Sequence, residues 1–281
     1  MSIRRTNYIK PERVPVEPVT VKKSQQPLGQ KPAPQLQPNR MTIEEKRSRM
    51  ERIRQNSNIA TERKAQKVAE SRHNSRPVYN YGKIDPIWKG ETVYIVAGGA
   101  SLQGFDFKKL NGKRVIAINK AFMYVPNASL LYWTDSRFYN WYKREIDALT
   151  CIKVTPSPSP RDLASDIIHL RNSGGRIIDM SPEKICSGNN SGFGAINLAL
   201  KLGASKIYLL GYDMKHTSGK SHFHDGYPNG SNSREHIYKG MVKYFEDNVA
   251  IINQMAEVYN TNPQSELKCF KFRTIEAALI S

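Results

Sequence analysis

The chain has 281 residues, of which 43 are Lys or Arg and 25 are Asp or Glu, and the formal net charge of +18 favours an acidic partner such as nucleic acid, a nucleotide or a membrane surface. This length has room for one α/β domain with an appendage, or for two small domains. Cys151, Cys186 and Cys269 lie far apart and do not indicate a disulfide framework or a zinc ribbon, and without a long apolar run or an apolar signal region we expect a cytoplasmic protein with no membrane span.

Residues 1–81 are predicted to form a tail that precedes a globular domain of residues 82–281. Seven prolines in the first 39 residues remove backbone donors, so this part is expected to be disordered. Thr42 and Glu45 have the spacing of a capping box, and residues 41–71 carry mixed charge with few large apolar side chains. The tail is therefore expected to be disordered or partly helical, and solvated throughout.

The tail also carries most of the positive charge. It holds 18 Lys and Arg against 7 Asp and Glu, a net +11 of the chain's +18. Almost no aromatic residue lies between Tyr8 and Tyr79, so base stacking on single-stranded nucleic acid is not expected. Two interpretations stay open: a solubilising linker, or an arm that attaches the protein to nucleic acid or to an acidic protein.

Three segments of the globular part have the composition of buried strands: residues 92–97, 114–119 and 130–135. Their carboxyl ends carry small or polar residues, namely Gly98, Gly99, Ser101, Asn119, Thr134 and Asp135. Open α/β sheets place their ligands at this edge, so these residues predict one shared crevice; the alternative is that they are ordinary turn residues at strand ends. The two glycines let the backbone approach a ligand, and we expect a side chain at Gly99, as in Gly99→Val, to abolish nucleotide binding while leaving the fold largely intact.

The middle of the domain is predicted to alternate further. We expect a helix over residues 138–149, a strand over 151–154, a short helix over 162–170 and a short strand over 176–179. Three prolines within residues 155–160 interrupt regular structure between the second and third of these elements.

A Ser, Gly and Asn loop, residues 187–192, leads into a helix predicted over residues 192–203, because apolar residues recur at helical spacing and Gly203 is a typical stop. Residues 207–210 form the apolar run of a central parallel strand, and Asp213 follows at its carboxyl end. The helix start offers unpaired N–H groups and the positive end of the helix dipole, which favours a phosphate there. The alternative is a purely structural connection from helix to strand.

Four motifs occur in a fixed order: Val96-Ala97-Gly98-Gly99-Ala100-Ser101-Leu102, Ile118-Asn119-Lys120-Ala121-Phe122, Ser191-Gly192-x-x-Ala195-x-x-x-Ala199 and Leu202-Gly203-x-x-x-Ile207-Tyr208-Leu209-x-Gly211-x-Asp213. In order and spacing they resemble the bacterial sialyltransferase family. They are also similar to the related family that includes 6-hydroxymethylpterin diphosphokinases and flagellin-glycosylation accessory proteins. The resemblance runs from residue 91 to the C-terminus, about two thirds of the chain.

The resemblance implies a Rossmann-like, mostly parallel α/β sheet with helices on both faces and a nucleotide-activated donor in its crevice. The family's nucleotide-holding roles would fall on Gly98, Gly99, Ser101 and Asn119, with Ser191 and Gly192 near the donor phosphate or sugar. The family's general base is a late His ahead of a long helix, and His236 precedes such a helix, predicted over residues 237–258. An imidazole with a pKa near 6.5 can take a proton from a hydroxyl at neutral pH.

One departure from the family concerns the segment after Asp213. The sialyltransferases have tyrosines there, whereas this chain has Lys215, His216, His222 and His224. Cationic donors can stabilise the developing charge of a leaving phosphate, which makes Lys215 and His222 further candidates for catalysis. His222, His224 and Asp225 are also candidate metal ligands, with a phosphate-contacting loop as the alternative.

The sequence therefore predicts a transferase that moves a glycosyl group from a nucleotide-activated donor to a hydroxyl acceptor, with no certain cofactor and a divalent metal left open. The alternatives are a diphosphotransferase acting on a pterin-like alcohol, and a non-catalytic nucleotide- or nucleic-acid-binding protein that retains the fold. The candidate site consists of His236, His222 and Lys215 for catalysis, and of Gly98, Gly99, Ser101, Asn119, Asp135, Ser191, Gly192 and Asp213 for the nucleotide.

Overall fold

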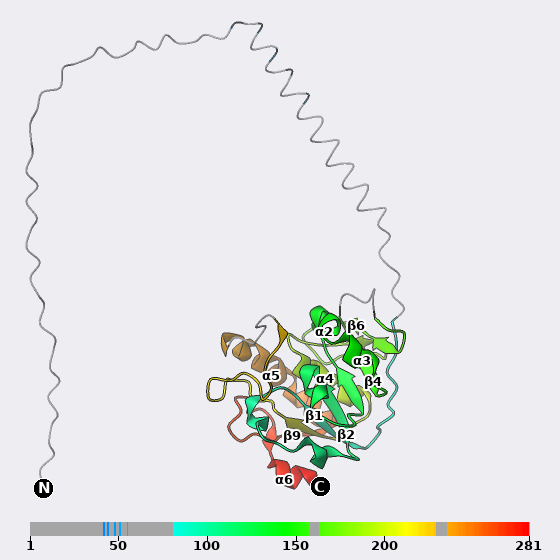
Figure 1. Cartoon of the computed structure of the whole chain (residues 1–281), viewed down its shortest axis with the longest axis vertical. Coiled ribbons are helices and arrows are strands. Elements are labelled where there is room, and N and C mark those ends of the chain that lie inside the picture. Colours follow the sequence, from blue (N-terminus) through cyan, green and yellow to red (C-terminus); the bar gives the residue numbers. More distant parts are fainter. Residues whose placement is uncertain are drawn as a thin grey trace, which may run out of the picture. The chain divides into compact units, whose positions relative to one another are not determined.

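The structure is a computed structural model that describes residues 42, 44, 48, 51, 55, 81–157, 163–228 and 235–280. Contacts divide the chain into two units, residues 1–75 and residues 76–281, and Figure 1 shows the helices and strands of the second. In the first unit, Glu44, Ser48, Glu51 and Gln55 are helical and exposed. The other predictions for the tail concern a disordered segment, the bounds of a helix and the binding of a partner. They fall outside the described residues and stay predictions.

The second unit is built on one parallel sheet of eight strands in the order β10-β9-β8-β1-β2-β3-β4-β5. The strands are β1 (Thr92–Val96), β2 (Arg114–Ile118), β3 (Leu130–Tyr132), β4 (Ile152–Thr155), β5 (Ile167–His169), β8 (Lys206–Leu210), β9 (Glu257–Asn260) and β10 (Lys271–Phe272). The chain runs outward from β1 to β5 and then returns to place β8 on the other side of β1. The strand order therefore reverses between β1 and β8, as in Rossmann-like folds.

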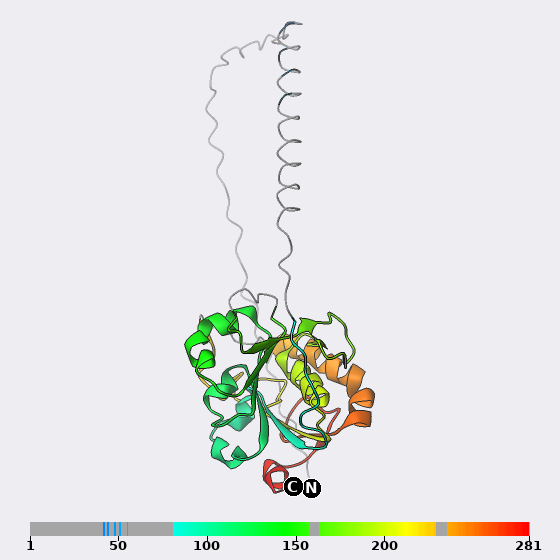
Figure 2. The same cartoon turned by 90° about the vertical axis from the view of Figure 1, so that its right-hand side faces the viewer.

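Helices cover both faces of this sheet, as predicted (Figure 2). One face carries α4 (Ser191–Lys201) and α5 (Tyr238–Met255). The other face carries α2 (Ser136–Trp141), α3 (Lys143–Asp147), α6 (Ile275–Leu279) and the short 3-10 helices η1 (Ala100–Leu102), η2 (Phe107–Leu110) and η3 (Asn119–Met123), while η5 (Glu235–Ile237) leads into α5. Among the described residues, none of these helices has the length and apolar character needed to cross a bilayer.

The strands are buried on both faces because side chains alternate across them. In β1, Val93 and Ile95 join the core under α4 and α5, whereas Tyr94 and Val96 join the core on the opposite face. The same alternation in β8 explains why its sequence is continuously apolar. Burial on both sides fixes the register of the central strands and so fixes where their carboxyl ends meet.

Three sequence predictions in the middle of the domain are wrong in detail. The helix over residues 138–149 is two short helices, α2 and α3, separated at Tyr142, whose backbone leaves the helical region with φ of −127°. The short helix over residues 162–170 is not formed, because Ile167–His169 instead pairs with β4 as the edge strand β5. β-branched residues at 167 and 168 favour the strand.

The strand expected over residues 176–179 is also absent from this described segment. Side-chain amides hold its backbone: Asn248 accepts from the N–H of Ile178 at 2.9 Å, and Asn197 accepts from that of Asp179 at 3.3 Å. A two-stranded sheet forms on either side of it, from β6 (Arg171–Asn172) and β7 (Lys184–Ile185). Two buried asparagines thus replace a strand partner for this segment.

Candidate functional site

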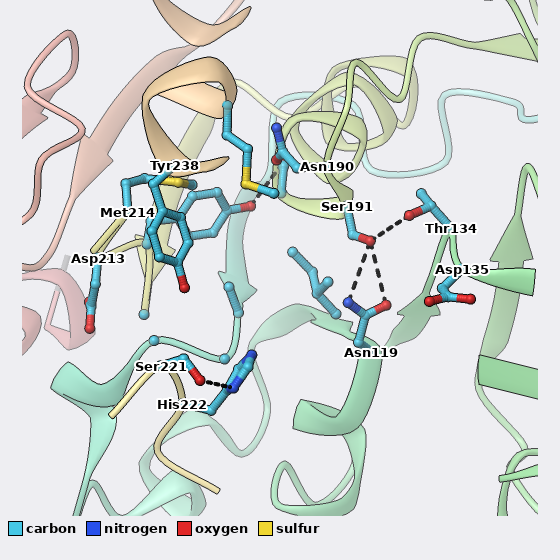
Figure 3. Close-up of a pocket in the computed structure, with 18 of the residues that line it drawn as sticks. Asn119, Thr134, Asp135, Asn190, Ser191, Asp213, Met214, Ser221, His222 and Tyr238 are labelled. Carbon is cyan, nitrogen blue, oxygen red and sulfur yellow. Dashed lines mark hydrogen bonds between the residues drawn. The ribbon is translucent and has the colours of Figure 1, made fainter. Parts of the chain in front are cut away.

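A pocket of about 460 Å³ lies at the carboxyl ends of the central strands, where the strand order reverses (Figure 3). Its walls combine residues that follow β1, β2, β3 and β8 with the starts of α4 and α5. Of the predicted nucleotide-binding residues, the lining includes Gly98, Gly99, Asn119, Asp135, Ser191, Gly192 and Asp213. The crevice predicted from polar strand ends is therefore present, at the place where open α/β sheets hold ligands.

Two glycines bring the ends of β1 and β8 into backbone contact. The N–H of Gly99 donates to the carbonyl of Gly211 at 2.9 Å, and Gly211 has a positive φ of 70°. A Cβ at Gly99 would lie 2.3 Å from the carbonyl oxygen of Gly211 and 2.7 Å from the Asp213 carboxyl carbon. The expectation that a side chain at Gly99 leaves the fold intact is therefore wrong, because this glycine is required by the contact between two strands.

The Asp213 carboxylate ties this glycine turn to the rest of the site. Asp213 is buried and accepts hydrogen bonds from the Ser101 N–H at 2.8 Å, from the Ser101 hydroxyl, and from the Asn262 amide at 2.8 Å. Ser101 lies outside the pocket lining, since its hydroxyl is directed to Asp213. A contact between Ser101 and a nucleotide stays a prediction, and the observed contacts make Ser101 a support of the turn.

The start of α4 forms the polar wall of the pocket. Asn190 caps the helix by accepting from the Phe193 N–H at 2.7 Å, which satisfies one of the first-turn donors. The Ser191 hydroxyl lies 2.7 Å from that of Thr134 and 3.4 Å from the Asn119 amide nitrogen (Figure 3). Residues that follow β2 and β3 thus form one hydroxyl and amide cluster with Ser191 at the N-terminus of α4.

The backbone of Asn119 and the charge of Asp135 are two further features of this wall. Asn119 has a positive φ of 48°, a conformation that Asn adopts more readily than most residues, and it turns the chain from β2 into η3. Asp135 caps α2 and pairs with Arg137 at 2.7 Å, and the hydrogen bonds from Arg137 lower the pKa of its carboxyl group despite partial burial. Asp135 is therefore ionised and already neutralised within the pocket.

The opposite wall is a loop that carries Ser221, His222 and His224. The N–H of Phe223 donates to the carbonyl of Gly98 at 3.0 Å, and a Cβ at Gly98 would lie 2.8 Å from the His222 ring. His222 hydrogen-bonds through Nδ1 to the Ser221 hydroxyl at 2.7 Å, and its ring stacks on His224 at 4.7 Å between centroids. Gly98 is thus a glycine because an imidazole packs directly on its backbone.

Both imidazoles are neutral at physiological pH. Burial lowers the pKa of His222 to about 4, with His216 and the Lys120 ammonium acting in the same direction, and burial lowers the pKa of His224 to about 3, with His222 and Lys120 acting in the same direction. The His224 Nδ1 accepts from the Gly226 N–H at 3.1 Å, which places the proton of the neutral ring on Nε2. Among the described residues, that Nε2 is buried and has no hydrogen-bond partner.

These pKa values predict an acid-sensitive fold. Unfolded histidine has a pKa of about 6.5, so the unfolded chain gains protons that the folded chain does not bind, and the free energy of unfolding should fall as the pH falls from about 7 toward 4. Urea midpoints measured at pH 7 and pH 5 check this, and a His224→Gln variant should show a smaller difference. An equally large difference in the variant would remove this histidine as a cause.

Lys120 holds in place the histidine loop, the segment that carries Ser221, His222 and His224. Its buried ammonium pairs with the Asp225 carboxylate and donates to the Gly226 carbonyl at 2.8 Å. Asp225 is therefore turned toward Lys120, and within the described parts of the chain no three His, Cys, Asp or Glu side chains are grouped as metal ligands. The candidate set of His222, His224 and Asp225 is not assembled, and a metal stays an untested prediction.

Two of the three predicted catalytic residues line the pocket, and the third does not. Lys215 lines the pocket and pairs with Glu266 at 3.3 Å, and His222 also lines it. His236 is exposed in η5 and is not part of the lining, whereas Tyr238, two residues on, points into the pocket (Figure 3). The general-base role of His236 stays a prediction from the resemblance, and the pocket geometry does not support it.

The sequence interpretation missed Met214, Tyr227 and Tyr238, which line the pocket, and Lys120, which pairs with Asp225 behind it. Lys120 directly follows Asn119, and Met214 directly follows Asp213. Their places next to predicted site residues could therefore have identified them. Met214 has a positive φ of 52°, which is uncommon for a bulky residue and typical of functional sites, but no sequence pattern reveals it.

No protein-family model and no curated protein matches the chain. Among solved structures, the chain is similar to the sialyltransferase CstII from Campylobacter jejuni in complex with cytidine-5′-monophosphate, with 16% sequence identity, a TM-score of 0.42, and coverage of 66% of this chain and 85% of that chain. It is also similar to a sialyltransferase CST-II in complex with a trisaccharide acceptor and CMP, with 16% identity, a TM-score of 0.40, and coverage of 64% and 85%.

Proposed function

We propose that the protein binds a nucleotide-activated sugar in this pocket and transfers the glycosyl group to a hydroxyl acceptor. The observation that carries the proposal is the position of the pocket: it lies where the strand order reverses, between the N-terminus of α4 and a neutral imidazole. The ordered motifs that resemble the sialyltransferase family contribute residues to both of these walls through Gly98, Asn119 and Ser191.

The donor phosphate would bind at the start of α4. The N–H groups of Ser191 and Gly192 lie in the first turn and have no intrahelical acceptor, and the helix dipole adds a partial positive charge. The Ser191 hydroxyl and the Asn119 amide extend this donor set, and Lys215 supplies a cation on the other side of the pocket. An anion here is stabilised by dipoles that are fixed before it binds.

His222 would serve as the general base of the transfer. In this role Nδ1–H of His222 would donate to the Ser221 hydroxyl, which leaves the lone pair of Nε2 to take the proton of the acceptor hydroxyl. The acceptor oxygen then forms a bond to the anomeric carbon, the bond from that carbon to the phosphate oxygen breaks, and the nucleotide leaves with the electron pair. Lys215 and the α4 N-terminus would stabilise the charge that develops on the leaving phosphate.

Thermal-shift assays with CMP-, UDP- and GDP-sugars and with ATP test the proposal. A specific ligand at 100 times its Kd stabilises the fold by about 2.7 kcal/mol, which should raise the melting temperature by several degrees. Ser191→Ala removes the hydroxyl shared with Thr134 and Asn119 and should weaken donor binding about tenfold. Ser205→Ala is the matched control, because Ser205 is exposed at the other end of β8.

The assay separates the alternatives. Stabilisation by one nucleotide sugar, reduced in Ser191→Ala and unchanged in Ser205→Ala, supports the proposed site. Stabilisation by ATP alone would favour the diphosphotransferase, whereas no response to any of these compounds would contradict a nucleotide-dependent enzyme.

A further inference from the structure

A second pocket, of about 390 Å³, shares a wall with the first. It is lined by Gln103, Gly219, Lys220, Ser221, His222, Phe223, His224, Asp225 and Gly226. Ser221 and His222 line both pockets, so the hydrogen-bonded pair that they form lies between the two spaces. His222, the proposed base of the transfer, therefore borders a second cavity that is separate from the pocket proposed for the nucleotide.

The second pocket has an uncompensated positive charge. Among the described residues that line it, only Asp225 carries a carboxylate, and this carboxylate is paired with the Lys120 ammonium. Among the residues that the structure describes, Lys220 forms no ion pair and is exposed, and Gln103 lines the same pocket. Of the lining residues that the structure describes, Phe223 alone has an apolar side chain, and it is itself buried in the core.

A tight turn places Lys220 at this site. Thr217 and Lys220 exchange two backbone hydrogen bonds, of 2.9 and 3.0 Å, around Ser218 and Gly219. Both intervening residues have positive φ values, 51° and 75°, which defines a compact reversal. The backbone of Lys220 is therefore fixed next to Ser221, and only its side-chain torsions are left to adapt to a ligand.

We propose that the second pocket is the acceptor subsite, and that it takes a hydroxyl compound carrying an anionic group, such as an acidic sugar. This inference rests on the proposed function and adds the class of acceptor to it. Lys220 would bind the anionic group, Gln103 would donate to or accept from hydroxyl groups, and the reacting hydroxyl would lie at the wall formed by Ser221 and His222. An apolar, flat alcohol has no comparable surface in this pocket.

In this proposal the shared wall serves the geometry of the reaction. A group transfer needs the acceptor oxygen within about 3 to 3.5 Å of the donor carbon, with nothing between them, and the base within hydrogen-bond reach of the acceptor O–H. The acceptor O–H gives its proton to His222, its oxygen bonds to the anomeric carbon, and the nucleotide leaves from the first pocket with the bonding electrons. The two pockets hold the two reactants, and His222 borders both.

The test uses p-nitrophenyl β-glucuronide and p-nitrophenyl β-glucoside, which differ in one carboxylate. NMR of the histidine side chains should show shifts of the His222 and His224 resonances on titration with the glucuronide and at least tenfold weaker binding of the glucoside. Lys220→Gln should remove the preference for the glucuronide. Lys83→Gln is the control, since Lys83 is exposed and lines neither pocket.

Each outcome decides the inference. Equal binding of the two glycosides, or a preference for the glucuronide that survives in Lys220→Gln, would overturn it. The thermal shift with the nucleotide sugar is measured on the same variants and should be unchanged in Lys220→Gln. Donor binding without glucuronide binding overturns the acceptor subsite and leaves the proposed function standing, while glucuronide binding without any donor binding overturns both the transferase and the acceptor role.

Discussion

Gly99→Ala is expected to lower the stability of the fold by more than about 3 kcal/mol, a large part of the 5 to 15 kcal/mol of a typical domain. A Cβ at this position would lie 2.3 Å from the Gly211 carbonyl oxygen, a distance that real Cβ atoms do not show. The two strands cannot move apart to relieve this clash, because β1 and β8 are paired through five residues each and buried on both faces. Urea unfolding followed by circular dichroism measures the loss.

Gly175→Ala provides the control for this experiment. The nearest atom to a Cβ at Gly175 is 3.7 Å away and its φ is not positive, so the free energy of unfolding should stay within about 0.5 kcal/mol of the parent value. A Gly99→Ala protein with the stability of the Gly175→Ala protein would mean that the ends of β1 and β8 do not approach as described. A binding defect in Gly99→Ala would not by itself identify a ligand contact, since the turn itself is displaced.

The fold was predictable because burial leaves a direct trace in the sequence. Central parallel strands are covered on both faces, so β1, β2 and β8 appear as apolar runs, and the crevice could be located from the polar residues that end them. The predictions for the short segments within residues 162–179 were wrong because the structure of these segments leaves no such trace in the local sequence. Their structure depends on an edge pairing with β4 and on side chains of Asn197 and Asn248, which are distant in the sequence.

The candidate site was predictable only in part, since the spacing of residues gives their relative directions around a helix but not which of these directions faces the pocket. Successive side chains in a helical turn point about 100 to 120° apart, so His236 and Tyr238 cannot both face the pocket. The resemblance identified a histidine ahead of a long helix, but the rotation of that helix start turns Tyr238 inward. The ion pair of Lys120 with Asp225, which holds the histidine loop, joins residues 105 positions apart.

His222→Gln is expected to reduce the rate of transfer by about 10² to 10⁴ while the thermal shift with the nucleotide sugar persists. Glutamine can keep a hydrogen bond to Ser221 but cannot take a proton from the acceptor. His236→Gln should stay within a few-fold of the parent rate, because the His236 side chain is exposed outside the lining of both pockets. The two variants therefore compare the base indicated by geometry with the base indicated by resemblance.

The pH dependence of the parent enzyme adds an independent criterion. Burial lowers the pKa of His222 to about 4, so this base keeps its lone pair throughout the mildly acidic range, and the rate should change little between pH 7 and pH 5. A base with the ordinary histidine pKa of about 6.5 would instead be mostly protonated at pH 5, and the rate would fall more than tenfold. A steep fall of this kind, together with a near-normal rate in His222→Gln, would assign the proton transfer to another group and leave His222 as a packing partner of Gly98.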